Sequence, residues 1–261
     1  MTTLLVVVGV LGLVVGSFLN VVIYRVPRDE SLLRPGSHCP HCQAAIRPRH
    51  NVPVLSWLVL RGRCAQCRQR ISARYPLVEA GTSLLFVAVS ARLGPSLVLP
   101  AYLYLAAVAV ALSMIDFEVR RLPNVIVLPS YVVGAVLLVP AAVAQADWWA
   151  GARGLIAAAA LWMFYLALAL VYPGGMGFGD VKLAGLLGLY LGWLGWSSVW
   201  VGTLLGFLLG ALVGVALLVT RRGNRKTALA FGPYMLGGAM LALFIAAPVA
   251  TWYAALLTPP A

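Results

Sequence analysis

Acidic side chains are scarce in this sequence of 261 residues, which holds seven Asp and Glu against nineteen Lys and Arg. Charged residues of both signs make up 10% of the chain, whereas 62% of it is hydrophobic. This balance lies far outside the range of soluble globular domains and excludes a water-soluble fold. Apolar runs of about 18 residues or more are typical of transmembrane helices, and several occur here. We therefore expect a polytopic membrane protein.

Histidine is equally rare, and its three copies all lie within residues 25–75. No histidine falls in an apolar run, which excludes a Ser–His dyad inside the bilayer. The sequence also lacks an H-E-x-x-H motif, which excludes a zinc-dependent intramembrane protease. If this chain hydrolyses peptides within the membrane, aspartate side chains are the remaining candidates for the catalytic groups.

Charges, prolines and Gly/Trp clusters divide the apolar sequence into eight segments. They lie near 2–23, 76–93, 96–115, 125–146, 152–172, 181–196, 198–220 and 233–257, and the sixth is short and glycine-rich. With eight spans, all but two of the nineteen basic residues fall on one side of the membrane, the exceptions being Arg92 and Arg153. The positive-inside rule makes the crowded side cytoplasmic and places both termini outside.

We therefore predict an all-α polytopic membrane protein with about eight transmembrane helices and a small cytoplasmic insert. The first transmembrane helix covers residues 1–24, the insert covers 25–75, and a transmembrane core covers 76–261. The basic charge of the insert is explained by topology and by attraction to anionic membrane lipid. Nucleic acid is not an expected partner.

The insert contains every cysteine of the chain, namely Cys39, Cys42, Cys64 and Cys67. Two C-x2-C pairs separated by 21 residues form a pattern close to that of a four-thiolate zinc site, because each pair converges two sulfurs on one point. An insert with few apolar residues also has too small a hydrophobic core to fold without a cross-link such as a bound metal ion. We predict a zinc-ribbon-like insert with structural Zn²⁺. Unliganded reduced cysteines are the alternative, and His38 or His41 could replace one thiolate.

Three carboxyl groups, Glu79, Asp116 and Asp180, lie within or at the edge of apolar segments, where ionisable groups indicate function by default. Asp116 ends the third segment and Asp180 begins the sixth, so both lie at the cytoplasmic membrane edge. Two carboxylates that share a site hold a single proton near neutrality. Such a pair suits peptide hydrolysis, because one carboxylate takes a proton from water while the other polarises the carbonyl.

The stretch PGGMGFGDVKL places Gly174, Gly175, Gly177 and Gly179 before Asp180. Residues without a Cβ allow a substrate backbone to approach closely, so we expect Gly177 and Gly179 to line the substrate site. Simpler interpretations remain open. Asp116 could anchor its helix end, Asp180 could be an N-cap, and Lys182 could extend to the lipid headgroups.

The chain closely resembles the type IV prepilin peptidases of the GxGD aspartic protease group. The resemblance rests on GSFLNVVIYRVP, CPHC, HNVPVLSWLVLRGRCAQC, ISARYPLVEAG, IDFEVRRLPN, GGMGFGDVKLAG and FGPYMLGG, in this order. It implies that Asp116 and Asp180 are the catalytic pair and that residues 76–261 form the peptidase core. It also implies a multi-pass protein of the bacterial cytoplasmic (inner) membrane. The substrates would be prepilins and pilin-like proteins, whose basic leaders are cut off after a glycine on the cytoplasmic side.

Many members of this family also methylate the new N-terminus with S-adenosylmethionine, and those members usually carry the tetracysteine insert. The resemblance therefore implies a possible methyltransferase activity, without assigning residues to the methyl donor. A basic leader needs acidic partners near the cytoplasmic face, and Glu79 and Glu118 are available. We hypothesise that one of them contacts the leader. A pairing of Glu79 with an arginine such as Arg74 is the alternative.

Two other functional classes compete with this interpretation. The first is a proton-coupled transporter that uses Asp116 and Asp180 as a proton relay, although the inverted repeats that would favour it are not visible. The second is a zinc-anchored assembly or nucleic-acid platform with an inert membrane part, which would depend on the cysteines and not on the aspartates.

Overall fold

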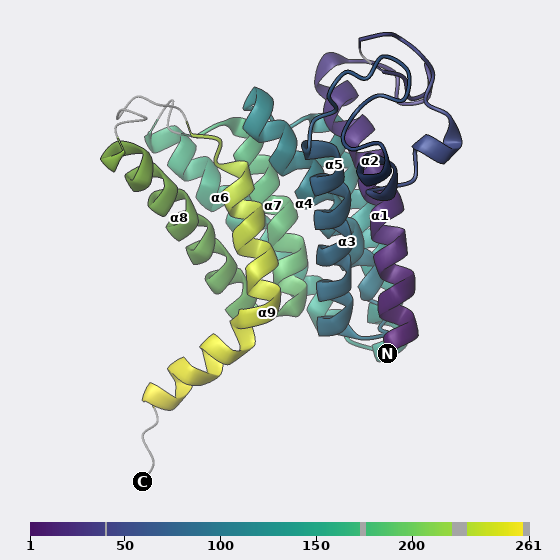
Figure 1. Cartoon of the computed structure of the whole chain (residues 1–261). Helices are drawn as coiled ribbons and strands as arrows, with labels where there is room; N and C mark the ends of the chain where they lie inside the picture. The colour runs from purple at the N-terminus through teal and green to yellow at the C-terminus, as the bar shows by residue number, and fades with distance from the viewer. Residues whose placement is uncertain (40, 173–175, 221–228, 258–261) are drawn as a thin grey trace. The chain divides into compact units, whose positions relative to one another are not determined.

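The computed structural model describes residues 1–39, 41–172, 176–220 and 229–257. The long helices of this described part are α1 (Thr2–Arg25), α3 (Arg74–Leu93), α4 (Leu99–Val119), α5 (Asn124–Gln145), α6 (Trp148–Val171), α7 (Phe178–Leu194), α8 (Trp196–Val219) and α9 (Gly232–Leu257) (Figure 1). The short elements are η1 (Val26–Arg28), η2 (Pro48–His50) and α2 (Leu55–Val59). The described residues contain no β-strand, and only two isolated β-bridges occur among them.

These helices confirm the predicted all-α polytopic membrane fold. Within the described residues, 7 helices are long and apolar enough to cross a membrane. The remaining long helix, α7, has 17 residues, which at about 1.5 Å per residue is slightly shorter than a bilayer core of about 30 Å. It corresponds to the sixth predicted segment and is buried along most of its length. Surrounding helices therefore cover α7.

The chain forms two compact units, Met1–Pro95 (unit 1) and Ser96–Ala261 (unit 2). In unit 1, α1 packs along α3, and glycines of α1 allow the two backbones to touch. A Cβ on Gly12 would lie 2.6 Å from the Ser83 Cα, and one on Gly16 would lie 2.7 Å from the Glu79 Cα. Small residues four apart are typical of close helix pairs in membranes. The Ser83 hydroxyl also donates a hydrogen bond to the Gly9 carbonyl at 2.8 Å.

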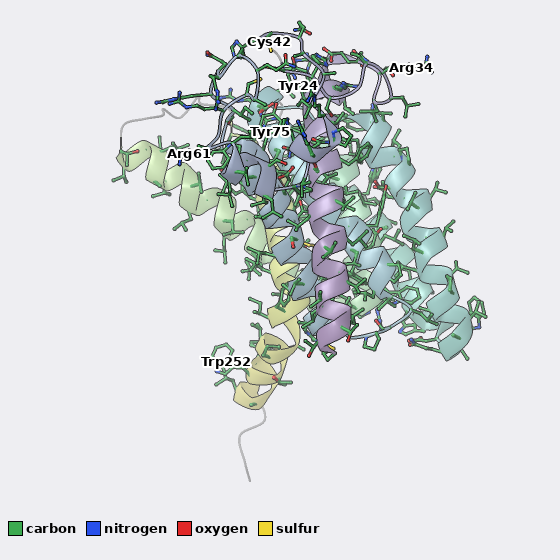
Figure 2. All side chains as sticks on the ribbon, turned by 45° about the vertical axis from the view of Figure 1, so that its right-hand side comes forward. Tyr24, Arg34, Cys42, Arg61, Tyr75 and Trp252 are labelled. Atoms are coloured by element: carbon green, nitrogen blue, oxygen red, sulfur yellow. The ribbon has the colours of Figure 1, made fainter. Side chains whose placement is uncertain are left out.

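The insert of unit 1 follows α1 and returns to α3 through largely irregular backbone. Figure 2 shows its polar side chains around one end of the helix pair, with Arg34 and Arg61 on opposite sides in this view. Its two C-x2-C turns have matching hydrogen bonds. The Cys39 carbonyl accepts from the Gln43 N–H at 2.9 Å, and the Cys64 carbonyl accepts from the Arg68 N–H at 3.1 Å. Gln43 and Arg68 both have a positive φ, 57° and 58° respectively, so the two turns end in the same way.

In unit 2, α7 packs against α5, α6, α8 and α9. Its contact with α6 is so close that a Cβ on Gly188 would lie 2.5 Å from the Ala157 carbonyl oxygen. At the other side, the buried Tyr102 of α4 donates a hydrogen bond to the Tyr190 carbonyl at 2.7 Å. Successive long helices of this unit run in alternating directions, so the end of α4 and the starts of α5, α7 and α9 lie at one end of the bundle (Figure 1). This end carries the candidate site.

Candidate active site

Asp116 lies in the last turn of α4 and is buried, with 4% of its surface exposed. Its Oδ2 atom accepts a hydrogen bond from the Gly232 N–H at 3.1 Å. Gly232 is the first residue of α9, and a carboxylate at a helix N-terminus is favoured by the free N–H groups and by the helix dipole. Asp116 is therefore held by the start of a distant helix and does not simply anchor the end of its own.

Asp180 lies in the first turn of α7 and is also buried, with 8% of its surface exposed. The N-cap of α7 is Gly177, and Asp180 occupies the third helical position. Its Oδ2 atom accepts a hydrogen bond from the Gly177 N–H at 3.1 Å. Asp180 thus reaches back to the cap residue. The simpler interpretation, in which Asp180 is itself the N-cap, is wrong.

The two carboxyl groups interact electrostatically, and Leu122 lies between the glycines beside them. A Cβ on Gly232 would lie 2.8 Å from the Asp116 Oδ2 atom and 3.2 Å from a methyl group of Leu122. A Cβ on Gly179 would lie 3.1 Å from the Leu122 Cβ. The segment between α4 and α5 therefore places one apolar side chain against the backbone next to each aspartate.

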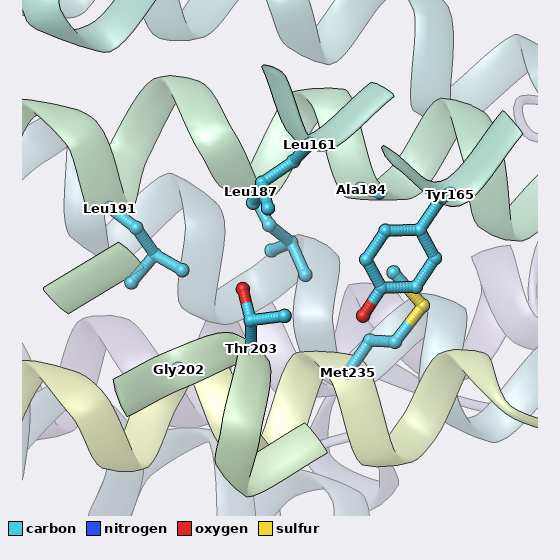
Figure 3. Close-up of a pocket in the computed structure, with 8 residues that line it drawn as sticks. All are labelled: Leu161, Tyr165, Ala184, Leu187, Leu191, Gly202, Thr203 and Met235. Atoms are coloured by element: carbon cyan, nitrogen blue, oxygen red, sulfur yellow. The ribbon is translucent and has the colours of Figure 1, made fainter. Parts of the chain in front are cut away.

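Two tyrosines border this pair. Tyr234 belongs to the FGPYMLGG block, whereas Tyr165 belongs to no motif that the sequence singled out. Tyr165 of α6 interacts electrostatically with Asp180, and Tyr234 of α9 interacts with Asp116. Tyr165 is buried, and its ring stacks on that of Phe207 with centroids 5.6 Å apart. Figure 3 shows Tyr165 at the edge of a small cavity that also contacts Thr203 and Met235. The cavity volume is about 10 Å³, which leaves room for about one water molecule.

The residues flanking Asp180 are placed by specific contacts. The Lys182 ammonium donates a hydrogen bond to the Asn124 Oδ1 atom at 2.9 Å, and it lies 5.0 Å from the centre of the Phe178 ring. Lys182 therefore links the starts of α5 and α7. Of the four motif glycines, Gly177 caps α7 and Gly179 lies in its first turn, whereas Gly174 and Gly175 lie outside the described residues.

The two glutamates proposed to contact the leader are placed differently. Glu79 belongs to unit 1 and is buried in α3, where its Oε2 atom accepts a hydrogen bond from the Val54 N–H at 2.7 Å. Glu118 belongs to unit 2 and is exposed, two residues after Asp116 on α4. Neither placement tests contact with a leader, so this assignment stays a prediction.

The four cysteines of the insert converge as their spacing predicts. The sulfur atoms of Cys39, Cys42, Cys64 and Cys67 all lie within 4.8 Å of one another, and those of Cys39 and Cys67 are 3.8 Å apart. A tetrahedron with Zn–S bonds of about 2.3 Å has sulfurs about 3.8 Å apart, so the cluster fits a zinc ion. Backbone N–H groups of Cys67 and Gln66 lower the pKa of the Cys64 thiol to about 6, which favours the thiolate that a metal requires. The Gln69 backbone lowers the pKa of the Cys67 thiol, but burial and hydrogen bonds with the other three sulfurs outweigh it and raise this pKa to about 11, so Cys67 must lose its proton to a bound metal.

The flanking histidines are not members of this cluster. His38 donates a ring hydrogen bond to the Gly36 carbonyl at 2.9 Å, which is a local loop contact. The four thiolates are therefore sufficient ligands for a closed tetrahedral site, and this geometry leaves no coordination position for a substrate.

Comparison with known proteins identifies both units. Residues 10–93 match the model of the bacterial peptidase A24 N-terminal domain, and residues 103–256 match that of the type IV leader peptidase family. A prepilin leader peptidase/N-methyltransferase of Pseudomonas putida is 41% identical over 256 residues, which cover 87% of this chain and 85% of the relative. Proteins with the same description from Aeromonas hydrophila and Pseudomonas aeruginosa are 38% and 34% identical, covering 93% and 89% of this chain and 91% and 87% of the relatives.

No solved structure gave a significant match. The transporter alternative is not favoured, because the relatives share a peptidase description. The matches along both units agree with the two membrane carboxylates and with the tetracysteine insert. The chain belongs to the type IV leader peptidase family.

Proposed function

We propose that this chain is an intramembrane aspartic endopeptidase that removes the basic leaders of type IV prepilins and pilin-like proteins. Asp116 and Asp180 are its catalytic pair, and the cut falls on the cytoplasmic side after a glycine. The observation that carries this proposal is the pair of buried carboxyl groups, each bound by the N–H of a glycine at the start of a helix. The family match and the descriptions of the relatives support the substrate class.

The proposed mechanism uses the pair with one shared proton. The ionised carboxylate removes a proton from water as the water oxygen attacks the scissile carbonyl carbon. The protonated carboxyl group donates a hydrogen bond to the carbonyl oxygen, which stabilises the charge that develops there. Collapse of the tetrahedral intermediate breaks the C–N bond, and the leaving amine takes up a proton from the pair.

Leu122 determines how a peptide would reach these carboxyl groups. Its side chain contacts the backbone at Gly179 and Gly232, so a bound peptide displaces it or lies against it. A peptide is cleaved in an extended conformation, and the missing Cβ atoms of Gly177 and Gly179 leave room for the substrate backbone. A glycine before the scissile bond fits the same narrow space.

We further propose that the protein N-methylates the new N-terminus of its substrate. When bound, S-adenosylmethionine supplies an electrophilic methyl group for this reaction. The four cysteines of the insert would hold Zn²⁺ in a structural role, because metal bound by four thiolates contributes folding free energy to a small domain. The protein would lie in the bacterial inner membrane among anionic lipids, with both termini outside and with no nucleic-acid partner.

Cleavage of a prepilin by purified Asp116→Asn and Asp180→Asn variants tests the peptidase proposal. Asparagine keeps an oxygen that can accept the glycine N–H, so each change removes chiefly the ability to carry charge. We expect kcat/KM to fall by about three orders of magnitude or more in either variant. Asp147→Asn is the matched control, because Asp147 caps α6 through the Ala150 N–H at 3.0 Å and asparagine caps equally well. Wild-type cleavage by either Asp116→Asn or Asp180→Asn would refute the proposal.

A further inference from the structure

Leu122 lies in the short segment between α4 and α5, and its backbone is held on both sides. Arg120 ends α4 with a positive φ of 52°. Pro123 follows Leu122 and is the N-cap of α5, and a residue before a proline is restricted to extended backbone. The next residue, Asn124, accepts a hydrogen bond at its Oδ1 atom from the Lys182 ammonium at 2.9 Å. The position of the Leu122 side chain is therefore set by a fixed backbone.

This side chain covers the two glycines beside the aspartates. A Cβ on Gly179, which precedes Asp180, would lie 3.1 Å from the Leu122 Cβ and 3.4 Å from a Leu122 methyl group. A Cβ on Gly232, which binds Asp116, would lie 3.2 Å and 3.3 Å from its two methyl groups. Carbon atoms in contact are about 3.5–4.0 Å apart, so neither place has room for one more carbon. Leu122 is only half-buried, so part of its surface remains free to contact a substrate.

The residue before the scissile bond brings its side chain closest to the carboxyl pair. This residue supplies the carbonyl carbon that water attacks, and its Cβ is two bonds, or about 2.5 Å, from that carbon. The Cβ of the residue after the bond is three bonds away. Reacting atoms must approach to about 3–3.5 Å, so a Cβ before the scissile bond enters the crowded space beside the two glycines.

We propose that Leu122 is a specificity-determining residue that restricts the position before the scissile bond to glycine. This inference rests on the peptidase function proposed above. Glycine has no Cβ and lies against Leu122 without displacing it. Alanine adds a carbon that must push Leu122 away, and the hydrogen bond between Lys182 and Asn124 opposes this movement because it ties the same segment to α7. The carbonyl of an alanine substrate is therefore held away from the carboxyl groups.

Cleavage of two prepilins, with glycine or alanine before the scissile bond, by the full chain in detergent tests this role. The measured quantity is kcat/KM for the glycine substrate divided by kcat/KM for the alanine substrate. One added carbon in a closed apolar site lowers kcat/KM by about 10- to 200-fold, and we expect a ratio in this range for the wild type. Leu122→Ala removes the γ-carbon and both methyl groups, so it should lower the ratio about tenfold or more. Leu122→Val should give an intermediate ratio.

The ratio separates a substrate contact from a structural role. An unfolded fraction lowers the cleavage of both substrates equally and leaves the ratio unchanged. If Leu122→Ala does not fold, Leu122→Val, which keeps a branched apolar side chain, carries the test.

Val125→Ala is the matched control for the Leu122 variants. Val125 is a branched apolar residue three positions further on, but it is exposed and is not among the atoms nearest to Gly179 or Gly232. This variant should keep the wild-type ratio. An equal fall of the ratio in Val125→Ala would show that any loss of apolar bulk near the start of α5 relaxes the selectivity, and it would overturn the proposal.

The remaining outcomes distinguish this inference from the function on which it rests. A wild-type ratio in both Leu122 variants, with cleavage retained, would overturn the role of Leu122 and leave the peptidase intact. A second substrate pair, which differs only in the residue after the scissile bond, checks the side of contact. A changed preference for that pair alone would also overturn the role. Absence of cleavage of every substrate by the wild-type protein would instead refute the peptidase function, and this inference would fall with it.

Discussion

The two units hold their polar groups in different ways. In unit 1, four cysteine sulfurs converge on irregular backbone, and a buried glutamate of helix α3 fixes a strained turn of the insert. In unit 2, the two aspartates lie on regular helices, and glycine N–H groups at helix starts bind them. An insert with little apolar core needs a metal to fix its conformation, whereas a packed membrane bundle fixes its site by the close approach of helices. Substitutions in unit 1 should therefore act on metal binding and on the conformation of the insert, whereas substitutions in unit 2 should act on catalysis.

The largest expected effect is on metal binding in unit 1. We expect Cys64→Ser to lower the zinc content from about one ion per chain to near zero, because a structural site with one thiolate removed binds zinc far more weakly. The insert should then be cut by a soluble protease at concentrations that leave the wild-type insert intact. Metal analysis and limited proteolysis measure both effects.

His38→Ala is the matched control for the cysteine variant. His38 adjoins Cys39 but donates to the Gly36 carbonyl and lies outside the sulfur cluster. This variant should keep its zinc and its resistance to proteolysis. Full zinc content in Cys64→Ser, or loss of zinc from His38→Ala, would contradict the four-thiolate site.

A smaller effect is expected from crowding the site of unit 2. Gly232→Ala places a methyl group 2.8 Å from the Asp116 Oδ2 atom, so the carboxyl group must move. A misplacement of a catalytic group by about 1 Å can lower the reaction rate about a hundredfold. We therefore expect kcat to fall by about ten- to a hundredfold. Steady-state cleavage of a prepilin measures the change.

Gly237→Ala controls for the loss of glycine from the same helix. A Cβ at Gly237 would lie 3.5 Å from a Leu209 methyl group, which is ordinary van der Waals contact. This variant should cleave at the wild-type rate, and alanine should slightly favour the helix. Equal activity in Gly232→Ala and Gly237→Ala would show that a methyl group at position 232 does not displace the Asp116 carboxyl group from its working position.

Much of this architecture follows from local sequence. Seven of the long helices in the described part of the chain were predictable because their apolar length suffices for a membrane span. The shorter α7 was predictable only as a weak glycine-rich segment, and the sulfur cluster was predictable because C-x2-C spacing fixes local geometry. Helix α7, which corresponds to the sixth predicted segment, begins at Phe178 rather than near residue 181. Gly177 caps this helix, and Asp180 lies inside its first turn.

Contacts between distant segments could not be predicted in this way. The hydrogen bond from Gly232 to Asp116 joins residues 116 positions apart, and the contacts of Leu122 depend on three helix ends meeting. Tyr165 belongs to an ordinary apolar helix, and no local pattern distinguishes it. The positive φ of Val54 is contrary to the preference of a β-branched residue, so only the Glu79 contact explains it.

The central claim is that Asp116 and Asp180 act as one catalytic unit, and the double variant Asp116→Asn/Asp180→Asn tests it most directly. Single-turnover cleavage of a prepilin, with enzyme in excess, would be measured for the wild type, both single variants and the double variant. Groups that work together are strongly non-additive, so we expect the double variant to cleave no more slowly than the slower single variant. Losses that multiply in the double variant would contradict the account, because the two aspartates would then act independently.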